Sequence, residues 1–172
     1  FKPYGATVGH GLEWSRLLLH LEATMADAAP TGLLETSRLL FDRAVADGWH
    51  VDGAPGFVYT TDWEGRPVVR ERMHWVAAEA IAAAAALHRR TGEEDYARRY
   101  AEWWDYAREH LVDRERGSWH HELDASNRPQ AHVWPGKPDL YHAVQATLLP
   151  RLPLAPSLAR AVALSTARPA PA

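Results

Sequence analysis

The alanine-rich stretch between Met73 and Arg90 constrains the fold more than any other part of the sequence. From Val76 to Leu87 every residue except Glu79 is apolar, and most of them are alanine. Such a run favours a helix, and a helix that is apolar on every side is normally buried on every side. We therefore predict a helix over residues 73–90 inside a larger helical assembly. Glu79 would be an isolated carboxylate within it, which is costly unless the carboxylate binds a partner.

Apolar residues recur at helical spacing in four further segments. These are residues 11–28, 33–47, 94–111 and 138–149. The segments 33–47 and 94–111 also carry a polar face, as expected for helices exposed on one side. Two stretches rich in glycine, proline and polar residues, 48–70 and 116–135, separate the helices and contain short β-like runs. Residues 57–60 and 67–70 are expected to pair as a β-hairpin.

The expected buried helices begin near residues 11, 73 and 138, so the pattern repeats at about 65 residues. Helical hairpins that alternate between an inner and an outer layer build an α/α toroid. A ring of six such hairpins needs roughly 390 residues, whereas this chain has 172. We predict an all-α fold in which residues 1–151 form one incomplete ring. Residues 152–172, rich in alanine and proline, are expected to be a partly disordered tail with a short helix near 157–164.

Composition excludes several classes of function. The net charge of −3, with no basic block, argues against a nucleic-acid surface, and the absence of cysteine excludes disulfides and thiolate metal sites. No apolar run approaches the roughly 18 residues of a membrane span, and no signal peptide pattern is present, so a cytoplasmic location is expected. His120, His121, Glu122 and His132 could suggest a metal site. Adjacent residues of a strand point to opposite faces, however, and no metal site is expected there.

Three polar clusters lie at the starts of the expected inner helices. They contain His10 and Glu13, then Trp75 and Glu79, then Asp139 and His142. Within each cluster the residues are three or four apart and share a helix face. Inner helices of a toroid run in the same direction, so the clusters should meet at one mouth of the ring. An aromatic ring beside polar groups suits a sugar, which offers C–H faces and hydroxyls. The alternative is that these are three unrelated helix caps or core histidines.

Two of these clusters carry a specific resemblance. Residues 3–16 read PYGATVGHGLEWSR, and residues 137–142 read KPDLYH. Both segments resemble motifs of the N-acylglucosamine 2-epimerase superfamily, closest to its branch of mannose isomerase-like and sulfoquinovose isomerase-type aldose–ketose isomerases. The similarity runs from Phe1 to about Arg151. It implies an (α/α)6 barrel of which this chain is the C-terminal part, because members of the family are more than twice as long.

The resemblance implies that His10 and His142 are the catalytic acid/base pair. It also implies sugar contacts for Glu13, Trp75, Glu79, Lys137 and Asp139. The chemistry agrees, since moving a proton between C1 and C2 of an open-chain sugar suits histidines, whose unperturbed pKa is about 6.5. This route requires no metal or other cofactor. A 2-epimerase acting on N-acylhexosamines or disaccharides and a non-catalytic helical interaction module are the alternatives.

The expected partners follow from the incomplete ring. They are a monosaccharide substrate and the N-terminal half of the same barrel. The helices at 11–28 and 73–90 are expected to leave apolar faces that neighbouring hairpins within the chain do not cover. A chain without its other half is therefore expected to be inactive and to associate with that half or with a second copy of itself.

Overall fold

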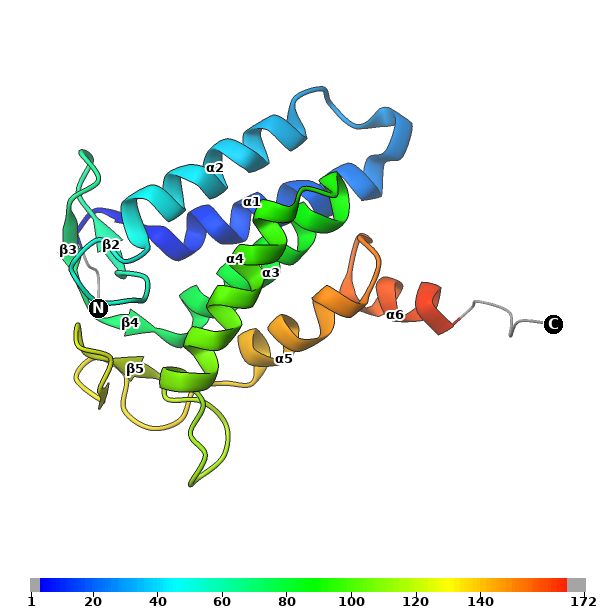
Figure 1. Ribbon diagram of the computed structural model, residues 1–172. Helices are drawn as coiled ribbons and strands as arrows, with labels where there is room; N and C mark the ends of the chain where they lie inside the picture. The colour runs from blue at the N-terminus through cyan, green and yellow to red at the C-terminus, as the bar shows by residue number, and fades with distance from the viewer. Residues whose placement is uncertain (1–3, 167–172) are drawn as a thin grey trace.

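A computed structural model describes residues 4–166 and contains six α-helices within this range (Figure 1). The helices are α1 (Val8–Met25), α2 (Leu33–Gly48), α3 (His74–Thr91), α4 (Glu94–Tyr106), α5 (Tyr141–Leu148) and α6 (Leu158–Thr166). Helix α1 packs against α2, and α3 packs against α4. Helix α3 also contacts α1 and α5, so α1, α3 and α5 form a row with α2 and α4 on its outer side. The predicted order of inner and outer helices is confirmed. No helix in the described range is both long and apolar enough to cross a membrane.

Helix α3 is the centre of the structure. Its alanines from Ala77 to Ala84 are buried, and Ile81 and Leu87 are fully buried. Small alanine side chains allow the close approach of α1, α4 and α5. The helix ends at Gly92, whose φ of 75° is readily adopted by glycine and whose N–H donates to the His88 carbonyl over 2.7 Å. The expectation that this helix leaves an apolar face uncovered is wrong, because α1, α4 and α5 pack around it and bury its apolar residues.

Helix α1 begins at Val8, three residues earlier than expected, so His10 lies in its first turn. The Val8 N–H donates to the Tyr59 carbonyl over 3.2 Å, which joins the start of the helix to the loop segment 48–70. Trp14, Leu21 and Met25 are exposed along the helix. For α1, therefore, the predicted uncovered apolar face is present.

Two small antiparallel sheets lie at the end of the molecule where α1 and α3 begin (left in Figure 1). One consists of β1 (Ala6–Thr7), β2 (Thr60–Thr61) and β3 (Pro67–Val69); the other consists of β4 (Arg72–Met73), β5 (Glu122–Leu123) and β6 (Pro129–Gln130). Strand β1 leads directly into α1, and β4 leads into α3. The predicted hairpin exists as β2 and β3, with shorter strands than expected. The sheets therefore hold the first turns of two inner helices beside the long loops.

The later helices differ from the prediction at their ends. The segment predicted as one helix over 94–111 is α4 followed by a π-helical turn, Ala107–Leu111, in which the Val112 N–H donates to the Ala107 carbonyl. Helix α5 begins at Tyr141 and not at Pro138. The Asp139 side chain accepts the Tyr141 N–H over 2.8 Å and thereby satisfies a first-turn donor from outside the helix.

The segment after Arg151 contacts the barrel helices. The Ala155 carbonyl lies 2.7 Å from Nδ1 of His20 on α1, and Ala155 and Ala161 are buried. The short helix expected near 157–164 is present as α6. The predicted disorder concerns residues 167–172, which lie outside the described residues, and the division of the chain at residue 151 stays a prediction.

Candidate active site

A pocket of about 250 Å³ lies where α3 and α5 begin. Its lining residues are Tyr59, His74, Trp75, His121, Trp134, Asp139 and His142. Three of them, Trp75, Asp139 and His142, are residues that the sequence analysis selected. The others come from the start of α3 and from the two long loops. The pocket therefore forms at the mouth where the polar clusters were expected to meet.

Trp75 brings the two predicted catalytic histidines together. Its indole lies 5.3 Å from the His10 ring and 5.7 Å from the His142 ring, measured between ring centroids. His10 comes from α1, Trp75 from α3 and His142 from α5, so one aromatic ring joins all three inner helices. The predicted convergence of His10 and His142 on one site is present in the structure, although His10 is exposed at the rim and does not line the pocket itself.

A glycine in α1 makes this close packing possible. A Cβ atom added to Gly9 would lie 2.4 Å from Cζ3 and 2.5 Å from Cη2 of Trp75. Carbon atoms in contact normally lie 3.5–4.0 Å apart, so any side chain at this position would displace the indole. The absence of a side chain at Gly9 thus sets where Trp75 lies, next to His10.

We predict that Gly9→Ala in the complete enzyme lowers kcat/KM by roughly 10-fold or more, because small displacements of positioning groups have effects up to about 10²-fold. Alanine favours the helix by about 1 kcal/mol, so a loss of activity would not reflect poor helix formation. The matched control is Gly11→Ala in the same helix, whose Cβ would meet Ala44 at 3.2 Å and no atom of Trp75. Wild-type kcat/KM in Gly9→Ala would show that the position of the indole does not matter.

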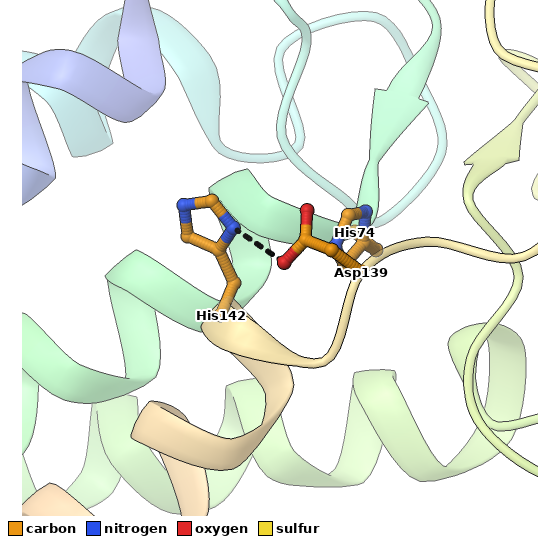
Figure 2. A group of neighbouring side chains, drawn as sticks. All are labelled: His74, Asp139 and His142. Carbon is orange, nitrogen blue, oxygen red and sulfur yellow. Dashed lines mark ion pairs between the residues drawn. The ribbon is translucent and has the colours of Figure 1, made fainter.

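His142 is placed between two carboxylates. Its Nδ1 lies 3.9 Å from Oδ1 of Asp139, and its Nε2 lies 4.0 Å from Oε1 of Glu79 (Figure 2 shows the pair with Asp139). Burial lowers the pKa of His142, and the charges of Asp139 and Glu13 oppose this effect. The imidazole is therefore mainly neutral at pH 7 and able to accept a proton, with carboxylates near it to stabilise the imidazolium that would form.

Glu79 forms a buried ion pair with Arg16 of α1. Its Oε2 accepts hydrogen bonds from Nε and Nη2 of Arg16 over 3.0 and 2.8 Å, and both side chains are at least 95% buried. The carboxylate is not on the outer surface, in line with the expectation that it binds a partner. Arg16 lies at the end of the motif formed by residues 3–16, and no role was predicted for it. Contact between Glu79 and a sugar stays a prediction.

The two other predicted sugar contacts lie farther from the pocket. Glu13 is partly buried on α1 and does not line the pocket, although its charge opposes the lowering of the His142 pKa by burial. The Lys137 ammonium donates to the carboxylate of Asp113, which lies just beyond the π-helical turn. The structure thus places Glu13 near the site, while it directs Lys137 to an ion pair outside the pocket.

His74 lines the pocket and was missed by the sequence analysis. It is 1% exposed, and neither ring nitrogen has a hydrogen-bond partner among the described residues. Its ring lies 5.0 Å from that of His121 and 5.9 Å from that of His142. Burial lowers the pKa of His74 to about 4, and the two neighbouring histidines add to the effect. The one feature of the sequence that could have indicated a role for His74 is its position directly before Trp75, at the start of a predicted inner helix.

The far wall of the pocket is a loop held by a buried carboxylate. Glu122 accepts the backbone N–H groups of Val133 and Trp134 over 2.9 and 3.0 Å and the Nε2 of Gln130 over 2.7 Å. This arrangement presents the Trp134 ring to His121, with the ring centroids 5.9 Å apart and the planes inclined by 21°. Carboxylate hydrogen bonds of this kind are strong, and here they fix a loop that has little regular structure.

His120 and His121 have different neighbours, as expected for adjacent residues of an extended segment. His121 lines the pocket, whereas Nδ1 of His120 lies 4.0 Å from Asp113. Within residues 4–166, the combination of His120, His121, Glu122 and His132 does not form a cluster with metal-ligand spacing.

The layered helical hairpins and the pocket at the starts of the inner helices define an α/α-barrel protein. The sequence matches the family model of N-acylglucosamine 2-epimerase (GlcNAc 2-epimerase) over residues 1–146, and the chain belongs to this family. It is 59% identical over 164 residues to the D-mannose isomerase of Thermobifida fusca, and 57% identical over 166 residues to that of Pseudomonas cannabina pv. alisalensis. Each alignment covers 95% of this chain but 40% of the relative, so the chain spans about 40% of the length of these proteins.

Solved structures give the same fold. A crystal structure of D-mannose isomerase superposes with a TM-score of 0.79 at 29% identity, covering 88% of this chain and 38% of that one. Cellobiose 2-epimerase from Bacillus thermoamylovorans B4167 superposes with a TM-score of 0.74 at 11% identity, covering 87% of this chain and 40% of that one. The predicted family and the predicted fold, the C-terminal part of an (α/α)6 barrel, are both confirmed.

Proposed function

We propose that this chain supplies part of the active site of an aldose–ketose isomerase that interconverts mannose and fructose. The single observation that carries the proposal is the placement of His10 and His142 against Trp75, in a chain 59% identical to a D-mannose isomerase. The two histidines come from different helices, and their rings lie 5.3 and 5.7 Å from the Trp75 ring.

The proposed reaction begins with opening of the pyranose ring, which requires a proton at the ring oxygen and the loss of one from the O1 hydroxyl. A base then removes the proton on C2 of the open-chain aldose, which gives an enediolate with its negative charge on O1. Delivery of a proton to C1 and transfer of the O2 proton to O1 give the ketose. Two histidines suit this sequence because ring opening and carbon deprotonation take place at different atoms.

The geometry suggests how the groups divide the work. Burial lowers the pKa of His142, so its imidazole is mainly neutral at pH 7 and can accept a proton from carbon, while the exposed His10 is placed to exchange protons with oxygen atoms at the rim. The face of Trp75 offers an apolar surface for sugar C–H groups. The ion pair of Glu79 with Arg16 lies next to Nε2 of His142 and would hold the imidazole in place.

The proposal includes completion of the barrel by a further part of the protein. On α5 and just before it, Leu140, Tyr141 and Val144 are exposed, and with Leu158 they line an apolar groove. Exposed apolar surface of this kind normally packs against another element. Because the relatives are much longer than this chain, we propose that their remaining hairpins cover this groove and the exposed face of α1. Cofactor-free catalysis, a cytoplasmic location and association with a second copy remain predictions.

A 2-epimerase is the second candidate, because the family name and the cellobiose 2-epimerase fold both point to it. The same base would remove the C2 proton, and a proton would return to the opposite face of C2. The difference lies in which carbon is reprotonated, so product analysis separates the two reactions.

We expect the complete enzyme to convert mannose into fructose, and chromatography of the products measures this conversion. When the reaction is run in D2O, deuterium should enter C1 of the fructose. Formation of glucose from mannose, without fructose, would show that the enzyme is a 2-epimerase and not an isomerase. The matched control is the 172-residue chain alone, which should be inactive and should associate in sedimentation experiments. An active monomer of this length would show that the rest of the ring is not needed.

A further inference from the structure

Three side chains of the pocket have the composition of a transition-metal site. His74, Asp139 and His142 each offer one ligand atom, and these atoms all lie within 4.8 Å of one another. Figure 2 shows the Asp139 carboxylate between the two imidazole rings. The three residues come from two elements, His74 from the start of α3 and the other two from the segment that begins α5.

The two imidazoles have nitrogen atoms available for a ligand. Both ring nitrogens of His74 and Nδ1 of His142 are buried without a hydrogen-bond partner among the residues that the structure describes. Buried polar atoms are normally satisfied, so an unpartnered set that faces one pocket indicates a missing ligand.

We propose that His74, Asp139 and His142 bind a divalent transition-metal ion of the Zn²⁺ class, which occupies the pocket in place of the sugar. Two imidazole nitrogens and one carboxylate oxygen match the preference of Zn²⁺, whereas Mg²⁺ and Ca²⁺ prefer oxygen ligands alone. The bound ion is an inhibitor and not a cofactor, because it engages the base that the isomerisation needs. Binding of the ion depends only on these three side chains, whereas its inhibitory effect rests on the proposed function.

The geometry allows the site to close around an ion. Ligand atoms about 2.0–2.2 Å from a tetrahedral Zn²⁺ lie roughly 3.3 Å apart, so the group must contract from its present spacing. Asp139 is exposed and precedes the first turn of α5, and its side chain can move toward the buried His74. Three protein ligands leave a fourth position for water, as in zinc sites that remain open to solvent.

The test is a titration of the protein with Zn²⁺ alone, in competition with a chromophoric chelator, and with Co²⁺, whose visible spectrum reports coordination. We expect one ion per chain. His142→Ala and Asp139→Asn should each weaken binding at least 10-fold. Asn at position 139 can still accept the Tyr141 N–H, so the start of α5 is retained. The control is His50→Asn, an exposed histidine outside the pocket, which should bind as the wild type does.

His74→Ala should also weaken binding, but it removes a buried side chain, so its folding is first checked by circular dichroism. If that variant does not fold, the comparison of Asp139→Asn with His50→Asn decides the question. Equal Zn²⁺ affinity in wild type, Asp139→Asn and His142→Ala, or no binding at micromolar Zn²⁺, would overturn the site. In the complete enzyme, Zn²⁺ should raise KM for mannose without changing kcat. A protein that binds Zn²⁺ but does not isomerise mannose would contradict only the proposed function.

Discussion

Replacing His142 with alanine in the complete enzyme is expected to lower kcat by at least about 100-fold, the usual minimum effect of removing a general acid or base. The imidazole lines the pocket, lies between the carboxylates of Asp139 and Glu79, and contacts Trp75. KM should change much less than kcat, because the lost interaction is a proton transfer made in the transition state. Steady-state kinetics with mannose at neutral pH measure both constants.

His10→Ala tests the second member of the proposed pair and should give a loss of similar size. The control for both variants is His50→Asn, which changes an exposed histidine outside the pocket. A kcat close to that of the wild type in either alanine variant would remove that histidine from the mechanism. Loss in one variant only would assign the acid and base steps to a single imidazole.

The second large effect concerns stability. Arg16→Leu is expected to lower the free energy of unfolding by about 3–5 kcal/mol, because it leaves the Glu79 carboxylate buried without its partner. Urea denaturation at pH 7 measures the change. The control is Arg43→Leu, which breaks the exposed pair with Asp47 on α2 and should cost less than about 1 kcal/mol.

The double variant Arg16→Leu with Glu79→Leu separates structure from catalysis. Replacing a buried ion pair by apolar residues is often nearly neutral, so most of the lost stability should return. We expect this folded variant to remain poorly active, because His142 has lost the carboxylate next to its Nε2. Recovery of both stability and activity would mean that the pair serves the fold alone. Equal stability in Arg16→Leu and wild type would contradict the reading of Glu79 as a carboxylate that depends on Arg16.

The sequence predicted the arrangement of inner and outer helices because α3 is so unusual. A helical run with a single polar residue over twelve positions is stable only in the interior of the protein. The neighbouring amphipathic helices are then expected to pack around it with their apolar faces. Trp75, Asp139 and His142 could be selected because helix starts in a toroid lie on the same side. These inferences used spacing along one helix, which follows directly from the sequence.

Long-range pairs could not be predicted in the same way. Arg16 and Glu79 are 63 positions apart, and nothing in either segment indicates that one is the partner of the other. His74 was overlooked because a histidine beside a tryptophan gives no sign that both its nitrogens will be buried without partners. The start of α5 was misplaced for a local reason: proline is common at the first position of a helix, but here the Asp139 side chain accepts the Tyr141 N–H and the helix begins after it.

The two ends of the inner helices differ in whether a substitution or an attached group there would disturb the pocket. At the strand-bearing end, the long loops and the starts of α3 and α5 share one pocket. At the other end, α1 and α3 turn into the next helices through short connections that contain Gly32 and Gly92, and no atom lies within 4 Å of a Cβ placed on either glycine. A helix of 18 residues is about 27 Å long, so Gly92 is separated from His74 by nearly the full depth of the barrel. A spectroscopic label, an affinity tag or a surface tether attached near Gly92 would therefore report on the molecule without entering its reactive mouth.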